Sequence, residues 1–436
     1  MKGRLSLLLL LALPALAFAQ YKPWYNFYNF AYGAKALAMG NAFVAVADDL
    51  TATFWNPAGL AAMRGPKLYL STKTTTQTHD YDLQDKVQTA DTWLYNYNFK
   101  SRLNQIDFFS VSAPIRAWKR PCTLALSYYR YIPYGFKGSA KEVLTFLLDR
   151  FNPKNTTLTF TGSEGLDVLA FSGSAALTDF LALGVTLQQF FGSGGLHVVL
   201  ENPQGEFHNQ ISEKMQGRNA IVGLMLAPLK QLRLGLTWHS GLKNHLDSDM
   251  LTWEVDEQGL EIDTELAQSR ARVELPRQVA VGALFKPRPW LDLSVEYSLL
   301  DWHKAFITDY FSAGEILPFP QKDDWTLGQK RARNLRCGAE ARLPMGSWLL
   351  HLRGGWSSDS QLYADVDDRA VRITGIAAGL GCDVSDYLAL EIAYQRQRGE
   401  WLEKGFVNQN PPVATHFRAS VFFLSLTYRF GHIFKD

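Results

Sequence analysis

The stretch QLRLGLTWH, residues 231–239, alternates apolar and polar residues over its whole length. Leu232, Leu234, Leu236 and Trp238 would lie on one face of an extended chain, and the residues between them on the other. This period of two predicts a β-strand with one apolar and one polar face. The stretches 290–297, 387–395 and 424–430 repeat it. A soluble sandwich and a membrane barrel both use such strands, so the strand pattern alone leaves both open.

The spacing of the strands separates the two folds. We predict roughly fourteen strands, beginning near Lys67, Gln105, Pro121, Gly165, Phe180, Gly217, Gln231, Ala271, Trp290, Ala332, Gly346, Ala370, Asp386 and Arg418. Short connections are expected at 113–121, 176–180, 227–231, 286–290, 343–347 and 382–386, and long ones between them, such as 76–104, 132–164, 192–216, 241–270 and 301–331. Strict alternation of turns and loops is typical of outer-membrane barrels. The sequence therefore predicts an all-β protein, a transmembrane antiparallel β-barrel.

The N-terminus predicts export. Lys2 and Arg4 precede an apolar run at 5–18, and Ala17-Phe18-Ala19 fits a signal-peptidase site. We expect residues 1–19 to be a signal peptide and Gln20 to begin the mature chain, in the outer membrane of a Gram-negative-type bacterium. Residues 20–66 then precede the first strand as a predicted hatch, and residues 67–436 form the predicted barrel.

Composition and motifs exclude several classes of protein. The chain has 436 residues, 20% of them charged, and a net charge of +2, so nothing favours nucleic-acid binding. Cys122, Cys337 and Cys382 are far apart and form no zinc or disulfide pattern. No catalytic, phosphate-binding or metal-ligand motif is present, so we expect neither an enzyme nor a cofactor. A Ca²⁺ site at the acidic pairs 323–324 or 367–368 is left open.

The segment before the first predicted strand has a distinctive composition. Its Ala and Gly residues suit short helices that pack closely, and Asp48-Asp49 can cap a helical turn at 50–54. Asn56-Pro57-Ala58-Gly59 follows, with Pro and Gly at positions that a type I turn favours. The residues alone are equally consistent with an ordinary turn that leads into the barrel.

The stretch GAKALAMGNAFVAVADDLTATFWNPAGLA, residues 33–61, resembles the N-terminal signature of the FadL family of outer-membrane long-chain fatty acid transporters. Asn56, Pro57 and Ala58 match the hatch motif of that family. Residues 275–302 and 365–395 are similar to two of its barrel hairpins. The resemblance implies a fourteen-stranded barrel whose lumen is closed by an N-terminal hatch, and passive transport of long-chain fatty acids or similar hydrophobic ligands.

The resemblance also implies a route and candidate residues. Substrate would enter from outside, reach a pocket beside the hatch, and leave sideways into lipid through a gap at a kinked strand. Pro133 and Gly135 are candidates for that kink, although they could instead end the strand at the outer rim. Phe43, Phe54 and Trp55 are candidates for substrate binding, although ordinary hatch packing would use the same residues.

The same signature also occurs in barrel subunits of a Bacteroidetes secretion system. The alternative is therefore a barrel that docks secretion-system partners without small-molecule flux. In both cases outer-membrane lipids are expected around the barrel.

Overall fold

The computed structural model describes residues 31–83, 97–117, 120–133, 135, 137–141, 157–203, 205–304, 306–311, 331–403 and 413–431. The predicted signal peptide, residues 20–30 of the predicted hatch and the acidic pair 323–324 lie outside these ranges.

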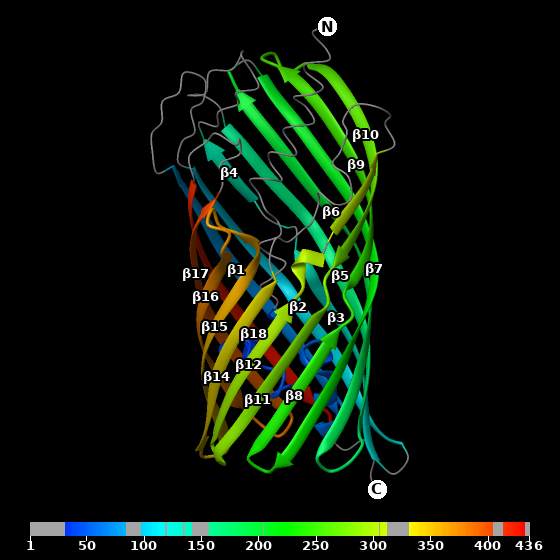
Figure 1. The fold of residues 1–436 in the computed structure, drawn as a ribbon, viewed down its shortest axis with the longest axis vertical. Helices are drawn as coiled ribbons and strands as arrows, with labels where there is room; N and C mark the ends of the chain where they lie inside the picture. The colour runs from blue at the N-terminus through cyan, green and yellow to red at the C-terminus, as the bar shows by residue number, and fades with distance from the viewer. Residues whose placement is uncertain are drawn as a thin grey trace.

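The described chain forms one closed antiparallel sheet, drawn as a tall cylinder in Figure 1. β1 pairs with both β2 and β18, which closes the cylinder. The strands are β1 (Lys67–Leu83), β2 (Tyr97–Ala117), β3 (Arg120–Pro133), β4 (Lys137–Lys141), β5 (Thr157–Ala176), β6 (Leu181–Asn202), β7 (Gly205–Leu229), β8 (Leu232–His239), β9 (Leu242–Asp256), β10 (Glu261–Leu275), β11 (Gln278–Arg288), β12 (Leu291–Leu300), β13 (Phe306–Phe311), β14 (Ala332–Met345), β15 (Trp348–Ala364), β16 (Ala370–Asp383), β17 (Leu388–Glu403) and β18 (Val413–Arg429).

Some strands of the barrel are split into two segments along one course. β3 continues as β4, β8 as β9, β10 as β11, and β12 as β13. Counted as courses, the segments make a 14-strand closed antiparallel barrel, which confirms the predicted fold class.

The connections predicted to be short are confirmed to be short. They join β2 to β3, β5 to β6, β7 to β8, β11 to β12, β14 to β15 and β16 to β17. Because every one of them follows a strand that runs in the same direction, all lie at one end of the cylinder, the lower end in Figure 1. This end is called the turn end below.

The prediction of long loops at 192–216 and 241–270 was wrong. β6 and β7 run through the first range and β9 and β10 through the second, and these hairpins raise one side of the wall (Figure 1). The reason is visible in β6. Near the turn end its apolar residues face outward, as Leu187 does, whereas beyond Gly192 the inward residues Leu196, Val198 and Leu200 are the apolar ones. The alternation of apolar and polar residues continues, but the apolar positions change from the outward to the inward face. A prediction that requires outward apolar residues therefore assigns this segment to a loop.

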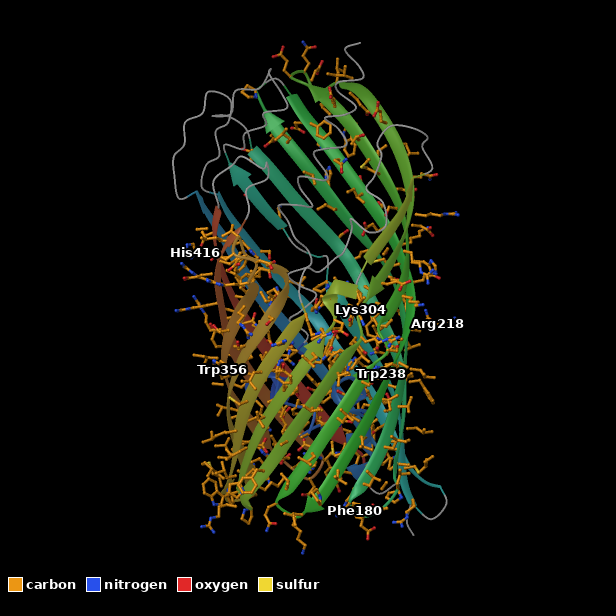
Figure 2. All side chains as sticks on the ribbon, in the orientation of Figure 1. Phe180, Arg218, Trp238, Lys304, Trp356 and His416 are labelled. Carbon is orange, nitrogen blue, oxygen red and sulfur yellow. The ribbon has the colours of Figure 1, made fainter. Side chains whose placement is uncertain are left out.

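The outer face of the lower wall is apolar and exposed. Leu236, Trp238, Val295 and Tyr297 are between 38% and 47% exposed, and Figure 2 shows Trp238 and Trp356 on the wall. The inward positions of the same strands are polar and buried, as with Thr237 and Glu296. This arrangement is the reverse of a soluble core, and it is the arrangement expected where the outer face contacts hydrocarbon.

Short helices fill the lower lumen. They are α2 (Ala34–Ala38), α3 (Ala52–Trp55) and the 3₁₀ helix η2 (Pro57–Ala62), coloured blue inside the barrel in Figure 1. A second 3₁₀ turn, η4 (Trp302–Lys304), belongs to the wall. Residues 31–66, called the hatch below, are largely buried there. No helix in the described part of the chain is both long and apolar enough to span a membrane.

Candidate functional site

Asn56 ties the hatch turn to the wall. Its Oδ1 accepts a hydrogen bond from the backbone N–H of Ala58 (3.1 Å), and its Nδ2 donates to the carbonyls of Val44 (2.8 Å) and, on β7, Leu224 (3.2 Å). The N–H of Gly59 donates to the Asn56 carbonyl (2.9 Å), which closes the turn. One fully buried side chain therefore holds together the turn, a second hatch segment and the barrel.

A buried carboxylate on β12 holds the hatch from the other side. Oε2 of Glu296 accepts hydrogen bonds from the backbone N–H groups of Phe43 (2.8 Å) and Val44 (2.9 Å). Its second oxygen pairs with Arg336 (3.2 Å), whose Nε contacts Asp359 at 2.9 Å. Because each buried charge has a partner, the wall presents a fixed acceptor to the hatch backbone.

Glycines of the wall let the hatch approach closely. A Cβ added to Gly355 would lie 2.0 Å from the nitrogen of Gly40, and one added to Gly223 would lie 2.1 Å from Oδ1 of Asn56. Gly184, Gly235 and Gly338 meet the hatch backbone in the same way. These five glycines, called the glycine seat below, allow backbone to pack on backbone. The seated hatch leaves no room for a substrate along them.

The predicted substrate-binding residues lie in aromatic packing inside the hatch. The ring of Phe54 lies 4.6 Å from Tyr32 and 5.4 Å from Trp55, and Trp55 lies 6.1 Å from Phe43, measured between centroids. Tyr32 also contacts the ring of Tyr129 at 4.9 Å. The structure thus brings Phe43, Phe54 and Trp55 together, buried and away from the lining of the cavity described below.

The wall is interrupted at the third course. Among the described residues, β2 pairs with β3 only as far as Phe108 and Tyr129, although β2 itself continues to Tyr97. The register of β3 against β5 shifts between Arg130 and Ile132. β3 then ends at Pro133, which has no N–H to donate to a ladder, and β4 begins at Lys137. The kink candidates Pro133 and Gly135 therefore stand at a break within the course, with β4 continuing beyond them.

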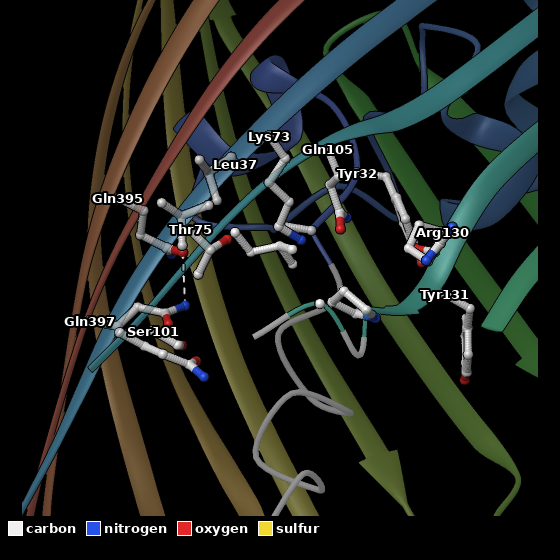
Figure 3. A pocket seen from close by; sticks show the side chains of 16 residues that line it. Tyr32, Leu37, Lys73, Thr75, Ser101, Gln105, Arg130, Tyr131, Gln395 and Gln397 are labelled. Carbon is white, nitrogen blue, oxygen red and sulfur yellow. Dashed lines mark hydrogen bonds between the residues drawn. The ribbon is translucent and has the colours of Figure 1, made fainter. Parts of the chain in front are cut away.

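A small cavity lies between this break and the hatch. Pro133, Gly135 and Tyr131 line it from the wall, and Tyr32 and Leu37 line it from the hatch (Figure 3). Its volume is about 50 Å³, far below the ~300–1,000 Å³ of sites that hold small molecules. A hydrophobic ligand would therefore need the surroundings to move.

The cavity also has polar walls. Its lining includes Lys73 and Arg130, and both have acidic partners, Lys73 with Asp107 (3.7 Å) and Arg130 with Asp167. Four glutamines contribute further, Gln77, Gln105, Gln395 and Gln397. Such a lining provides hydrogen bonds for one polar end of a ligand.

The lumen between the hatch and the turn end is charged. Lys35 of the hatch contacts Asp48 (2.9 Å) and Glu340 on β14 (3.3 Å). Arg353 on β15 contacts Glu340 (2.6 Å) and Glu391 (2.9 Å). A hydrocarbon that passed straight down the barrel would have to separate or desolvate these pairs.

Several residues of this site were missed from the sequence, namely Tyr32, Lys73, Glu296, Arg336 and the glycine seat. A signal existed for Glu296, because a carboxylate stands at the inward position between Val295 and Tyr297. The inward glycines of successive strands are a second signal. Neither signal identifies the hatch residue that each one contacts.

Comparisons with solved structures agree with this architecture. A FadL homologue from Pseudomonas aeruginosa matches at 16% identity and a TM-score of 0.66, over 92% of this chain and 99% of the other. The toluene transporter TbuX of Ralstonia pickettii matches at 15% identity and a TM-score of 0.60, with the same coverage. The toluene transporter TodX of P. putida matches at 13% identity and a TM-score of 0.63, again over 92% and 99%.

No protein-family model matches the chain, and no curated protein matches it by sequence. At these identities the likeness concerns the fold. A closed 14-strand barrel, a lumen filled by an N-terminal hatch, and coverage of nearly the whole of each solved chain lead to one conclusion. This chain therefore has the same fold as the FadL homologue and the two toluene transporters.

Proposed function

We propose that the protein is a passive outer-membrane conduit for hydrophobic small molecules, long-chain fatty acids among them. The observation that carries the proposal is the end of β2–β3 pairing beside the cavity at the hatch. A molecule in that cavity faces the hatch on one side and the broken course of the wall on the other. The hatch shifts, the cavity enlarges, and the molecule leaves sideways into lipid.

Sideways exit is favoured over passage through the lumen because a hydrocarbon chain in a water-filled lumen would be exposed to water. Each methylene exposed to water costs about 0.8 kcal/mol, so a chain of fifteen costs about 12 kcal/mol. The charged pairs around Glu340 and the close contacts of the glycine seat stand in the lumenal path. An exit between β2 and β3 leads instead toward the outer face of the wall, which is apolar.

The substrate class is supported by two kinds of evidence. Two of the similar solved structures are named as toluene transporters and one as a FadL homologue. The cavity combines hydrocarbon surface with Lys73 and Arg130, which suits a molecule with an apolar body and one polar end. We therefore favour fatty acids over purely aromatic hydrocarbons.

Uptake measurements test this function. Cells that lack other routes, with and without the protein, are given radiolabelled oleate or toluene. Faster uptake of oleate with the protein supports the proposal. Asn56→Ala should change the rate while the barrel still assembles. Equal uptake of both probes with and without the protein contradicts it.

The docking alternative is favoured by one observation. The raised hairpin of β9 and β10 exposes Leu260, Ile262 and Leu266 by 63%, 63% and 65%, and exposed apolar residues are typical of contact surfaces. A pull-down that recovers envelope proteins and loses them in Leu260→Ser/Ile262→Ser/Leu266→Ser, together with absent probe uptake, would favour docking.

A further inference from the structure

The outer face of the wall changes character along β16, β17 and β18. On β17, Leu390, Ile392 and Tyr394 point outward and are followed on the same face by Arg396 and Arg398. β18 shows the same change in the opposite chain direction, from Leu424 and Phe422 to Arg418. On β16, Arg372 lies beyond Ile376 on that face.

The four arginines Arg372, Arg396, Arg398 and Arg418 form one exposed group, called the arginine cluster below. Arg398 stands directly opposite Arg418 in the β17–β18 ladder and opposite Thr374 in the β16–β17 ladder. Arg396 stands opposite Ser420 and contacts its hydroxyl at 3.5 Å. In Figure 2, nitrogen-tipped side chains project from the wall beside His416, which lies above Trp356.

The cluster has no acidic partner in the described part of the chain, since none of the ion pairs there involves its members. Glu400, the carboxylate of the next outward position on β17, contacts His416 instead (3.5 Å). Like charges placed opposite each other across a ladder are destabilising. Four exposed guanidinium groups gathered on one face, none of them in an ion pair of the described residues, therefore present a positive site that an anion of matching size can neutralise.

Some other exposed arginines are ion-paired, Arg270 with Asp247 (3.4 Å) and Arg331 with Asp301 (2.7 Å), whereas Arg333 on β14 is exposed and in no ion pair of the described residues. What sets the arginine cluster apart is that four arginines stand on one face of three neighbouring strands, β16, β17 and β18.

We propose that the arginine cluster binds the headgroup of a membrane lipid that carries two phosphate groups. The cluster directly continues the apolar face, so a lipid whose acyl chains lie on Ile392, Tyr394 and Phe422 places its headgroup there. Each phosphate monoester carries about 1.5–2 negative charges, and two of them balance the four guanidinium groups. Guanidinium also matches phosphate by paired hydrogen bonds. The inference rests on the proposed membrane location and is independent of what the barrel transports.

Binding to the purified, delipidated protein in neutral detergent tests the proposal. The probes are diphosphorylated lipid A, its monophosphorylated form, phosphatidylglycerol and inorganic phosphate, and the readout is the dissociation constant from native mass spectrometry. We expect diphosphorylated lipid A to bind at least tenfold more tightly than each other probe. Arg396→Gln/Arg398→Gln/Arg418→Gln should weaken that binding at least tenfold.

The control is Lys214→Gln/Arg218→Gln/Arg270→Gln, which removes the same charge from exposed positions on β7 and β10. It should bind like the unmodified protein, and both variants should retain heat-modifiable migration as folded barrels. Equal weakening in both variants, equal affinity for the mono- and diphosphorylated lipids, or saturation by inorganic phosphate alone would each overturn the assignment. None of these outcomes depends on uptake, so failure here leaves the transport proposal intact.

Discussion

The hydroxyl of Tyr32 donates a hydrogen bond to the backbone carbonyl of Arg130 over 3.1 Å. Tyr32 belongs to the hatch, and Arg130 lies on β3 where its register against β5 shifts, just before Pro133. Figure 3 shows the two side chains next to each other at the cavity. The hydrogen bond thus joins the hatch directly to the interrupted third course of the wall, so that movement of one affects the other.

Tyr32→Phe should loosen the hatch without disturbing its aromatic packing. The change removes one hydrogen bond, worth about 1 kcal/mol, so hatch amides should exchange with deuterium roughly five times faster, as should those of residues 128–133. The control is Tyr297→Phe on the outer wall. If exchange of the hatch is the same in Tyr32→Phe as in the control, the bond does not couple the two elements.

Gly223→Ala should unseat the hatch. The added Cβ would lie 2.1 Å from Oδ1 of Asn56 and 2.8 Å from Cδ of Pro57, so the hatch turn must move. We expect larger ion conductance through single barrels in a planar bilayer. Gly354→Ala is the matched control, since a Cβ there meets nothing within 4 Å. A conductance of Gly223→Ala equal to that of Gly354→Ala would show that close packing on the glycine seat does not close the lumen.

Glu296→Gln should weaken the attachment of the hatch to β12. The carboxylate accepts hydrogen bonds from two backbone N–H groups and pairs with Arg336. Hydrogen bonds to a charged group contribute about 1.5–3 kcal/mol each. Protease cleavage within residues 31–66 should become at least tenfold faster, whereas exposed Glu400→Gln should leave it unchanged. Resistance equal to the unmodified protein would mean that Glu296 does not secure the hatch.

The hatch should be held more firmly at mildly acidic pH. Burial, and then the charge of Glu391, raise the pKa of Asp49 from 3.8 to about 7. The raised pKa belongs to the state in which the hatch is seated, and the ordinary pKa of 3.8 to the state in which it is not. The stability of the seated hatch is therefore greatest where Asp49 is protonated in both states, and this stability falls as pH rises from 3.8 to about 7. Hatch amide exchange, corrected for the intrinsic rate, should be slower at pH 6 than at pH 8. Asp49→Asn should remove the difference, and a difference that persists there would point to another group.

Much of the wall could be predicted from the sequence because its signals are local. The period of two in residues 231–239 and the tight turns each depend on neighbouring residues only. The raised hairpins were missed because the outward face there is polar, as in β6 beyond Gly192, where Leu196 and Val198 point inward.

The hatch was predicted from the stretch around Asn56-Pro57-Ala58, but its attachment was not. Glu296 is separated from Phe43 by 253 positions, and Asn56 from Leu224 by 168. A single sequence does not reveal contacts between residues so far apart in the chain. Which wall residue faces which hatch residue is decided only when the barrel closes around the hatch. The break at Pro133 could not be predicted either. A proline that ends a strand and one that interrupts it have the same local sequence, and only the position of β4 distinguishes them.

A disulfide that locks the hatch tests the central claim most directly. The hydroxyls of Thr53 in the hatch and Ser127 on β3 lie 2.9 Å apart, so these two side chains already touch across the boundary between hatch and wall and are the pair chosen for Thr53→Cys/Ser127→Cys. The pair is introduced after Cys122, Cys337 and Cys382 are replaced by alanine, with each single cysteine as control. Oleate uptake should stop in the oxidised double variant and return on reduction. Undiminished uptake with the disulfide formed would contradict transport by movement of the hatch.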